Sequence, residues 1–103
     1  MDRIQQLNEF LKINDQDCFV KHALALEHIK TGDDETAKRL FEEVLDTDEN
    51  YIGSYYHLAK LLERNADNEA AIAVYEKGMK HAKDAGEQLA YNELRSAYEE
   101  LIF

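Results

Sequence analysis

The chain has 103 residues, enough for one domain with a hydrophobic core, and 45% of them are hydrophobic while 33% are charged. Proline is absent and only four glycines occur, a composition that favours long helices joined by short turns and argues against disorder. The formal net charge of −10 argues against general binding to nucleic acid or anionic membrane, and a lone cysteine, Cys18, excludes an internal disulfide scaffold.

Residues 1–15 are predicted to contain one helix. Its Leu7 and Leu11 lie 34 residues before Phe41 and Leu45, so the segment matches the second helix of a two-helix unit whose first helix is missing. The segment has neither the continuous apolar stretch nor the cleavage site of a signal peptide, and nowhere do about 18 apolar residues run together. We therefore expect a cytoplasmic protein.

Two similar helix pairs are predicted next, in residues 18–51 and 52–85. Written 34 residues apart, 24-LALEHIKTGDDETAKRLFEEVL-45 overlays 58-LAKLLERNADNEAAIAVYEKGM-79. Large and small residues recur together in the pairs Leu24 and Leu58, Ala25 and Ala59, Ala37 and Ala71, and Phe41 and Tyr75. These pairs are therefore predicted to be equivalent core positions.

Each helix pair has a break in its middle, at Gly32-Asp33 in the first and at residues 65–67 in the second. Asp33 and Asp67 are predicted to cap the second helix of each pair, because their side chains can accept free backbone N–H groups. Gly32 is predicted to end the first helix.

The stretch between the pairs, 46-DTDENYIGSYYH-57, begins like a calcium loop of the EF-hand type. The pattern then fails, because Tyr51, Gly53 and His57 stand where it requires a glycine, an apolar residue and a closing glutamate. No metal site is predicted here. The acids of residues 48–50 are interpreted as turn formers and as N-terminal charges of a helix that begins at Tyr51.

Residues 86–103 are predicted to form a last helix, whose core positions lie 36 residues after those of 52–85: Tyr91, Leu94 and Tyr98 follow Tyr55, Leu58 and Leu62. Arg95 stands where the helix pairs have Ala25 and Ala59. A long charged side chain is acceptable there only if no further helix packs against it. The segment is therefore interpreted as a capping helix.

These features resemble the tetratricopeptide repeat family, whose 34-residue unit carries the pattern W-x2-L-G-x2-Y, then A-x3-F, then P. The matching residues are Tyr55-x2-Leu58-Ala59-x2-Leu62 with Ala71-x3-Tyr75, and Leu24-Ala25 with Ala37-x3-Phe41; Lys21, His28, Glu49 and Lys83 depart from the pattern. The resemblance implies an all-α fold, a right-handed α–α superhelix in a single domain over 1–103. Its parts would be a half-repeat (1–15), two full repeats (18–51 and 52–85) and a capping helix (86–103), as in small free-standing bacterial repeat proteins.

In such a solenoid, the first helices of successive repeats line a concave face. The resemblance therefore implies a non-catalytic adaptor or scaffold, with no cofactor, that binds a peptide segment of another protein in this groove. The side chains expected in the groove are Phe19, His22, Leu26, Ile29, Lys30, Tyr56, His57, Lys60, Glu63, Arg64, Leu89, Asn92, Ser96 and Glu99.

Two properties of this set bear on the partner. It contains large apolar side chains on the side of the helix opposite the predicted core. It also places the cations Lys30, Lys60 and Arg64 together in an otherwise strongly acidic chain. The hypothesis is a peptide with an apolar anchor and a free carboxylate or an acidic side chain. Capture of a chaperone's C-terminal carboxylate, as in some family members, fits poorly because His22, Leu26 and His57 replace the required Lys or Asn.

Other functions stay open. The main alternative is a structural module that forms a homodimer through the groove or its terminal helices, supported by the apolar end Leu101-Ile102-Phe103. His22 and His57 could approach each other and bind a transition metal. An enzyme is not expected, because the sequence has no HExxH motif, no glycine-rich phosphate loop and no nucleophile beside a base.

Overall fold

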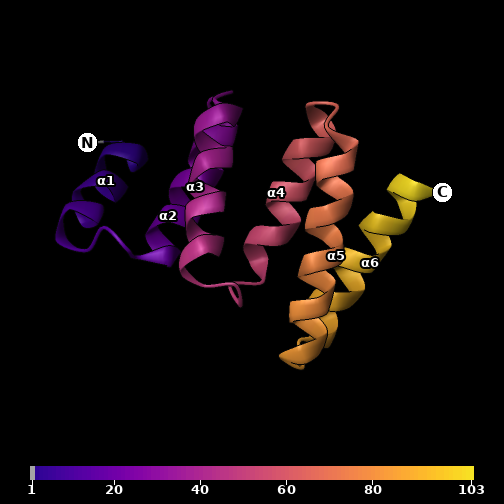
Figure 1. The fold of residues 1–103 in the computed structure, drawn as a ribbon. Helices are drawn as coiled ribbons and strands as arrows, with labels where there is room; N and C mark the ends of the chain where they lie inside the picture. Colours follow the sequence, from indigo (N-terminus) through magenta and orange to yellow (C-terminus); the bar gives the residue numbers. More distant parts are fainter. Residues whose placement is uncertain (1) are drawn as a thin grey trace. The chain divides into compact units, whose positions relative to one another are not determined.

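The computed structural model describes residues 2–103, and all regular secondary structure in this range is helical (Figure 1). The helices are α1 (Arg3–Ile13), α2 (Cys18–Lys30), α3 (Asp34–Thr47), α4 (Gly53–Arg64), α5 (Asn68–Asp84) and α6 (Gln88–Ile102). Met1, the first residue of the predicted range 1–15, lies outside the described residues. The helices pack into two compact units, one ending at Asp48 and one spanning Glu49–Phe103.

In the first unit, α2 packs against both α1 and α3. Its buried hydrophobic residues are Leu7, Val20, Leu24, Ala25, Ala37, Leu40, Phe41, Val44 and Leu45. All four core positions expected in this unit from the 34-residue overlay are among them. In α1, Leu7 is buried as predicted, whereas Leu11 is only half-buried.

In the second unit, α5 packs against both α4 and α6 (Figure 1). The buried residues are Ser54, Tyr55, Leu58, Ala59, Leu61, Leu62, Ala71, Tyr75, Gly78, Ala82, Leu94 and Ala97. The side chain of Arg95 is 61% exposed and its Nε lies 2.7 Å from Glu99 Oε1. The arginine at the alanine position is thus on the surface, as the capping interpretation requires.

Aspartates begin four of the helices. The side chains of Asp2, Asp17, Asp33 and Asp67 each accept a hydrogen bond from the backbone N–H three residues further on. Such bonds satisfy N–H groups that have no partner within the helix and fix the residue at which it starts. The predicted caps at Asp33 and Asp67 are therefore confirmed.

Gly32 and Ala66 turn the chain at equivalent points of the two helix pairs. Both adopt positive φ, 83° at Gly32 and 64° at Ala66. In each pair the following aspartate N–H reaches back five residues, Asp33 to His28 O at 2.8 Å and Asp67 to Leu62 O at 2.9 Å. This closure ends one helix and places the cap of the next, as predicted for Gly32.

We expect Ala66→Gly to stabilise the second unit by about 0.5–1 kcal/mol, because glycine adopts positive φ without the penalty that a Cβ imposes. Urea denaturation followed by far-ultraviolet circular dichroism measures the change. The matched control, Gly32→Ala at the equivalent turn, should lower the free energy of unfolding of the first unit by about the same amount. No gain in the first variant would show that the strain at Ala66 is offset within the turn.

The joint between the units differs from the sequence-based expectation. α4 begins at Gly53 rather than Tyr51, and its N-cap Ile52 provides no side-chain hydrogen bond. Glu49 points to α5 instead: its Oε2 lies 3.3 Å from Lys77 Nζ and 3.7 Å from His81 Nε2. Asn50 Oδ1 lies 3.2 Å from His81 Nδ1. The joint is thus held by residues about 30 positions away, which helix-capping rules do not anticipate.

Candidate protein-binding surface

In the first unit, the expected binding residues of α2 differ in exposure. Phe19 is 66% exposed, Lys30 is exposed, and His22, Leu26 and Ile29 are half-buried. The His22 ring lies edge-on to Phe41, with centroids 5.5 Å apart. Lys30 Nζ is 3.3 Å from Glu27 Oε1. Phe19 is therefore the expected residue of α2 that offers a large, open apolar surface.

In the second unit, residues of α4 and α6 line an open, shallow cleft of ≈ 290 Å³ that we call the α4–α6 cleft. It is lined by Tyr56 and Lys60 from α4 and by Glu93, Ser96, Ala97 and Glu100 from α6. Of these, Tyr56, Lys60 and Ser96 were expected binding residues. Glu93, Ala97 and Glu100 were not expected, although residues 93, 96, 97 and 100 form one i, i+3, i+4, i+7 stripe of a helix.

The Lys60 side chain contacts two residues of its own helix, Tyr56 and Glu63. Its Nζ lies 5.9 Å from the centroid of the Tyr56 ring, within the range of a cation–π contact, and 3.8 Å from Glu63 Oε2. The Lys60 and Glu63 side chains are 38% and 23% exposed, so the pair is partly shielded from water. The positive charge expected to attract an acidic partner is thus offset by a neighbouring carboxylate.

A buried hydroxyl supports Glu63. Tyr75 of α5 is 0% exposed, and its hydroxyl donates a short hydrogen bond to Glu63 Oε2. Burial raises the pKa of Tyr75, and the hydrogen bond to the Glu63 carboxylate raises it further. Tyr75 therefore stays protonated and keeps Glu63 in place beside Lys60.

The other expected residues do not line the α4–α6 cleft. His57 is half-buried, its ring 5.6 Å from that of Tyr56, and burial lowers its pKa, so the imidazole is neutral at pH 7. On α6, Leu89 is 80% exposed, Asn92 accepts a hydrogen bond from Gln88, and Glu99 pairs with Arg95. Arg64 is exposed at the end of α4.

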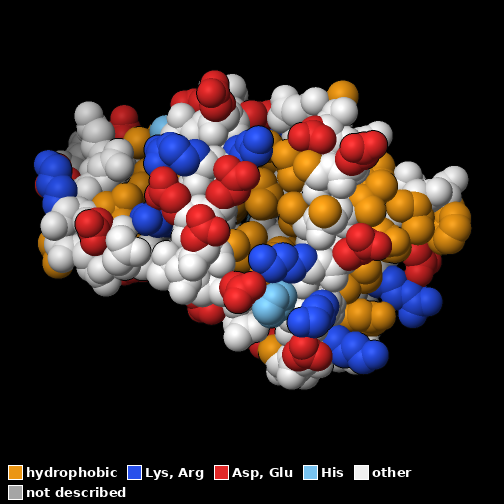
Figure 2. All heavy atoms as spheres, in the orientation of Figure 1, with side chains coloured by type: hydrophobic (Ala, Val, Ile, Leu, Met, Phe, Trp, Pro, Cys, Tyr) orange, Lys and Arg blue, Asp and Glu red, His pale blue; other side chains and the backbone are white. Residues whose placement is uncertain are grey.

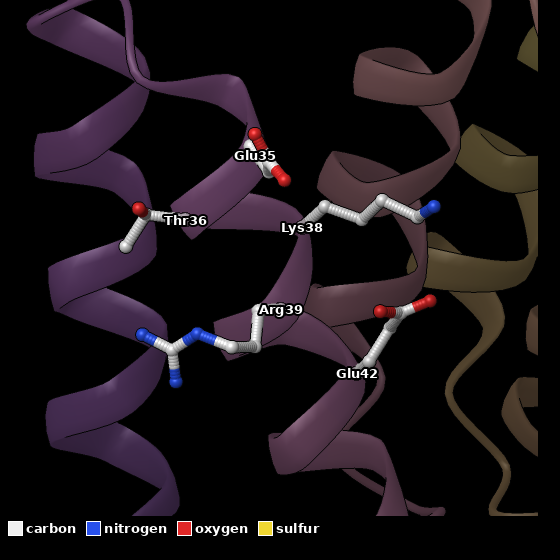
Figure 3. Close-up of a pocket in the computed structure, with 5 residues that line it drawn as sticks. All are labelled: Glu35, Thr36, Lys38, Arg39 and Glu42. Carbon is white, nitrogen blue, oxygen red and sulfur yellow. The ribbon is translucent and has the colours of Figure 1, made fainter.

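A second hollow, of ≈ 400 Å³, lies on α3 (Figure 3). Its lining residues are Glu35, Thr36, Lys38, Arg39 and Glu42, and Arg39 pairs with Glu43 at 2.7 Å. Two bases and two acids among the lining residues balance each other. Figure 2 likewise shows acidic and basic side chains interspersed over α3. The hollow therefore has no clear preference for a ligand of either charge.

In the described part of the chain, no three or more His, Cys, Asp or Glu side chains are arranged to hold a metal ion. Among residues 2–103, no helix has the length and apolar character needed to cross a membrane. Burial raises the pKa of the Cys18 thiol, which reduces the reactive thiolate at neutral pH.

Comparison with known proteins decides the family. The sequence pattern of the tetratricopeptide repeat family matches residues 20–51 and 52–84. The chain belongs to the tetratricopeptide repeat family. Proteins of this family generally mediate protein–protein interactions and are generally non-catalytic. No curated protein matches the chain.

Solved structures of other tetratricopeptide repeat proteins agree. A tetratricopeptide repeat domain protein from Salinibacter ruber, solved by NMR, is 41% identical, with a TM-score of 0.80 over 82% of this chain and 86% of that one. The crystal structure of the Salinibacter ruber protein, at the same 41% identity, has a TM-score of 0.78 over 82% of this chain and 94% of that one. A Bordetella parapertussis protein shares the fold at 20% identity, with a TM-score of 0.84 over 99% of this chain and 89% of that one. The predicted all-α class and tetratricopeptide solenoid are thereby confirmed.

Proposed function

We propose that this tetratricopeptide repeat protein is a non-catalytic adaptor that binds a segment of another protein, with the α4–α6 cleft as a contact point. The observation that carries the proposal is the cleft itself, ≈ 290 Å³ in volume. This is at or below the roughly 300–1,000 Å³ of small-molecule pockets, so it suits one side chain of a peptide better than a whole metabolite.

The lining of the cleft fits a peptide. The Tyr56 ring and Ala97 offer apolar surface, while Ser96 offers a hydroxyl that can donate or accept a hydrogen bond. Tyrosine is enriched at binding hot spots because its ring buries area at little entropic cost. In the first unit, the exposed Phe19 of α2 offers apolar surface of its own.

The sequence favoured an acidic or carboxylate-bearing partner. This preference was based on Lys30, Lys60 and Arg64, and two of these cations have a carboxylate beside them: Glu27 for Lys30 and Glu63 for Lys60. An incoming carboxylate would have to compete with these neighbours. These two cations therefore give the surface little net attraction for a carboxylate.

The test uses a phage-displayed library of random peptides, about 12 residues long, selected on the purified protein. We expect selected peptides to bind saturably and to lose about tenfold or more in affinity on Tyr56→Ala, because an interface anchor is removed. Fluorescence anisotropy with labelled peptides measures this. Phe103→Ala, which removes an aromatic residue that is 95% exposed, is the matched control and should change affinity less than about twofold.

A library that gives no peptide with Tyr56-dependent affinity would contradict the proposal. Self-association is the second candidate, favoured by Phe10 and Ile13 of α1, which are 55% and 85% exposed. Light scattering over a wide concentration range separates the two. A constant mass of 12.0 kDa would speak against a homodimer, and a mass that doubles with concentration would support it.

A further inference from the structure

The carboxylates around the α4–α6 cleft differ in their partners. Glu63 pairs with Lys60 and accepts the Tyr75 hydroxyl hydrogen bond. Glu93 and Glu100, which line the cleft from α6, make no ion pair and no hydrogen bond through their side chains within residues 2–103. The cleft therefore presents two carboxylates that have no ion-pair or hydrogen-bond partner in the described chain.

The balance of charge at the cleft is negative. One ammonium, that of Lys60, stands among the carboxylates of Glu63, Glu93 and Glu100. After burial and the Glu63 hydrogen bond, the negative charge of Glu100 also contributes to the raised pKa of the buried Tyr75. The chain as a whole carries −10, so a cation approaching the cleft is attracted from a distance as well.

The cleft already holds one cation. The Lys60 ammonium lies over the Tyr56 ring and beside Glu63, an arrangement of aromatic face and carboxylate that stabilises positive charge. The position of Lys60 thus shows that the α4 side of the cleft accommodates a positive charge. It also competes with any second cation for the same ring.

We propose that the α4–α6 cleft receives an arginine or lysine side chain from a basic segment of a partner protein, an inference that rests on the proposed function. The incoming cation lies against the Tyr56 ring and pairs with Glu93 or Glu100. These two residues are seven positions apart on one helix, about 10 Å by the helical rise. A segment in the polyproline II conformation, with three residues per turn and a rise of about 3.1 Å per residue, presents residues i and i+3 on one side about 9 Å apart, so two basic residues with this spacing engage both carboxylates.

The test starts from peptides selected as above, which we expect to be enriched in Arg and Lys. Glu93→Gln combined with Glu100→Gln should weaken the best peptide about tenfold, because each exposed charge pair contributes a few-fold. Glu42→Gln with Asp46→Asn removes the same charge from exposed positions of α3 and should change affinity less than about twofold. Both double variants should melt like the parent, because their side chains are exposed.

Lys60→Met should change the affinity for basic and for acidic peptides in opposite directions. It keeps the apolar stem over Tyr56 and removes the competing ammonium, so a basic peptide should bind several-fold more tightly. An acidic peptide would instead bind more weakly. Anisotropy titrations with the selected peptide, and with its version carrying Gln in place of Arg and Lys, measure both effects.

The outcomes separate the two proposals. Basic peptides that weaken on loss of Glu93 and Glu100 and strengthen on Lys60→Met support the inference. Peptides that need Tyr56 but are acidic or neutral, and that are unaffected by the loss of Glu93 and Glu100, overturn it and leave the proposed function standing. The absence of any Tyr56-dependent peptide overturns both.

Discussion

Ala59→Arg is expected to unfold the second unit or leave it severely loosened. Ala59 is 0% exposed in the centre of α4, so the arginine would have to push neighbouring helices apart and bury an unpaired guanidinium. The combined cost is about 3–5 kcal/mol, a large part of the roughly 5–15 kcal/mol that stabilises a typical domain. Urea denaturation followed by circular dichroism at 222 nm measures the loss.

The matched control for Ala59→Arg is Ala73→Arg on α5, where the alanine is exposed. The same change in size and charge should alter stability there by no more than about 0.5 kcal/mol. If Ala59→Arg melted at the same temperature as the parent, the packing of α4 described above would be wrong, and with it the 34-residue register.

Gly78→Ala is expected to destabilise the second unit by about 1–3 kcal/mol, although alanine is the better helix former by about 1 kcal/mol. A Cβ at Gly78 would lie 2.7 Å from Tyr55 Cβ and 2.9 Å from Tyr55 Cγ. The position of Tyr55 Cβ is fixed by the backbone and no change of rotamer moves it away, so α4 and α5 would have to separate. Thermal and urea denaturation measure the change.

Ala73→Gly calibrates the propensity term in the same helix, at an exposed position. It should lose about 1 kcal/mol with no contribution from packing. A Gly78→Ala variant that is more stable than the parent by that amount would sink the idea that close approach of α4 and α5 requires a glycine.

The fold followed from the sequence because its determinants recur at a fixed distance. Ala25 and Ala59, or Phe41 and Tyr75, could be paired by counting alone, and all four are 0% exposed. The caps Asp33 and Asp67 were equally predictable from the sequence, because they bond to N–H groups only three residues away. Local rules and one period therefore predicted where the helices break and which positions are buried.

Pairwise contacts between helices were harder to predict. Gly78 occupies the position of Val44 one repeat earlier, so the repeat comparison predicts a valine-like packing residue and not a point of close approach. The acids of the joint were assigned to the nearest helix end, although Glu49 and Asn50 contact His81 of α5. These contacts depend on how two helices are placed in space, which spacing along the chain does not give.

The candidate site was predicted only in part, for a similar reason. The resemblance indicated the helices that carry it, and Tyr56, Lys60 and Ser96 do line the α4–α6 cleft. It did not indicate that Glu93 and Glu100 turn into the same cleft. The Lys60–Glu63 pair could have been anticipated, because residues three apart on a helix are neighbours.

The contacts of His81 give the second repeat two different starting points. By sequence pattern the repeat begins at residue 52, where the family match begins. By packing it begins at Glu49, because Glu49 and Asn50 contact His81 and the Tyr55 hydroxyl donates to Glu49 O at 2.6 Å. A fragment cut at the pattern boundary would lose these partners and leave the Tyr55 hydroxyl without its acceptor. The natural module for grafting or duplication is therefore the one that carries its preceding joint with it.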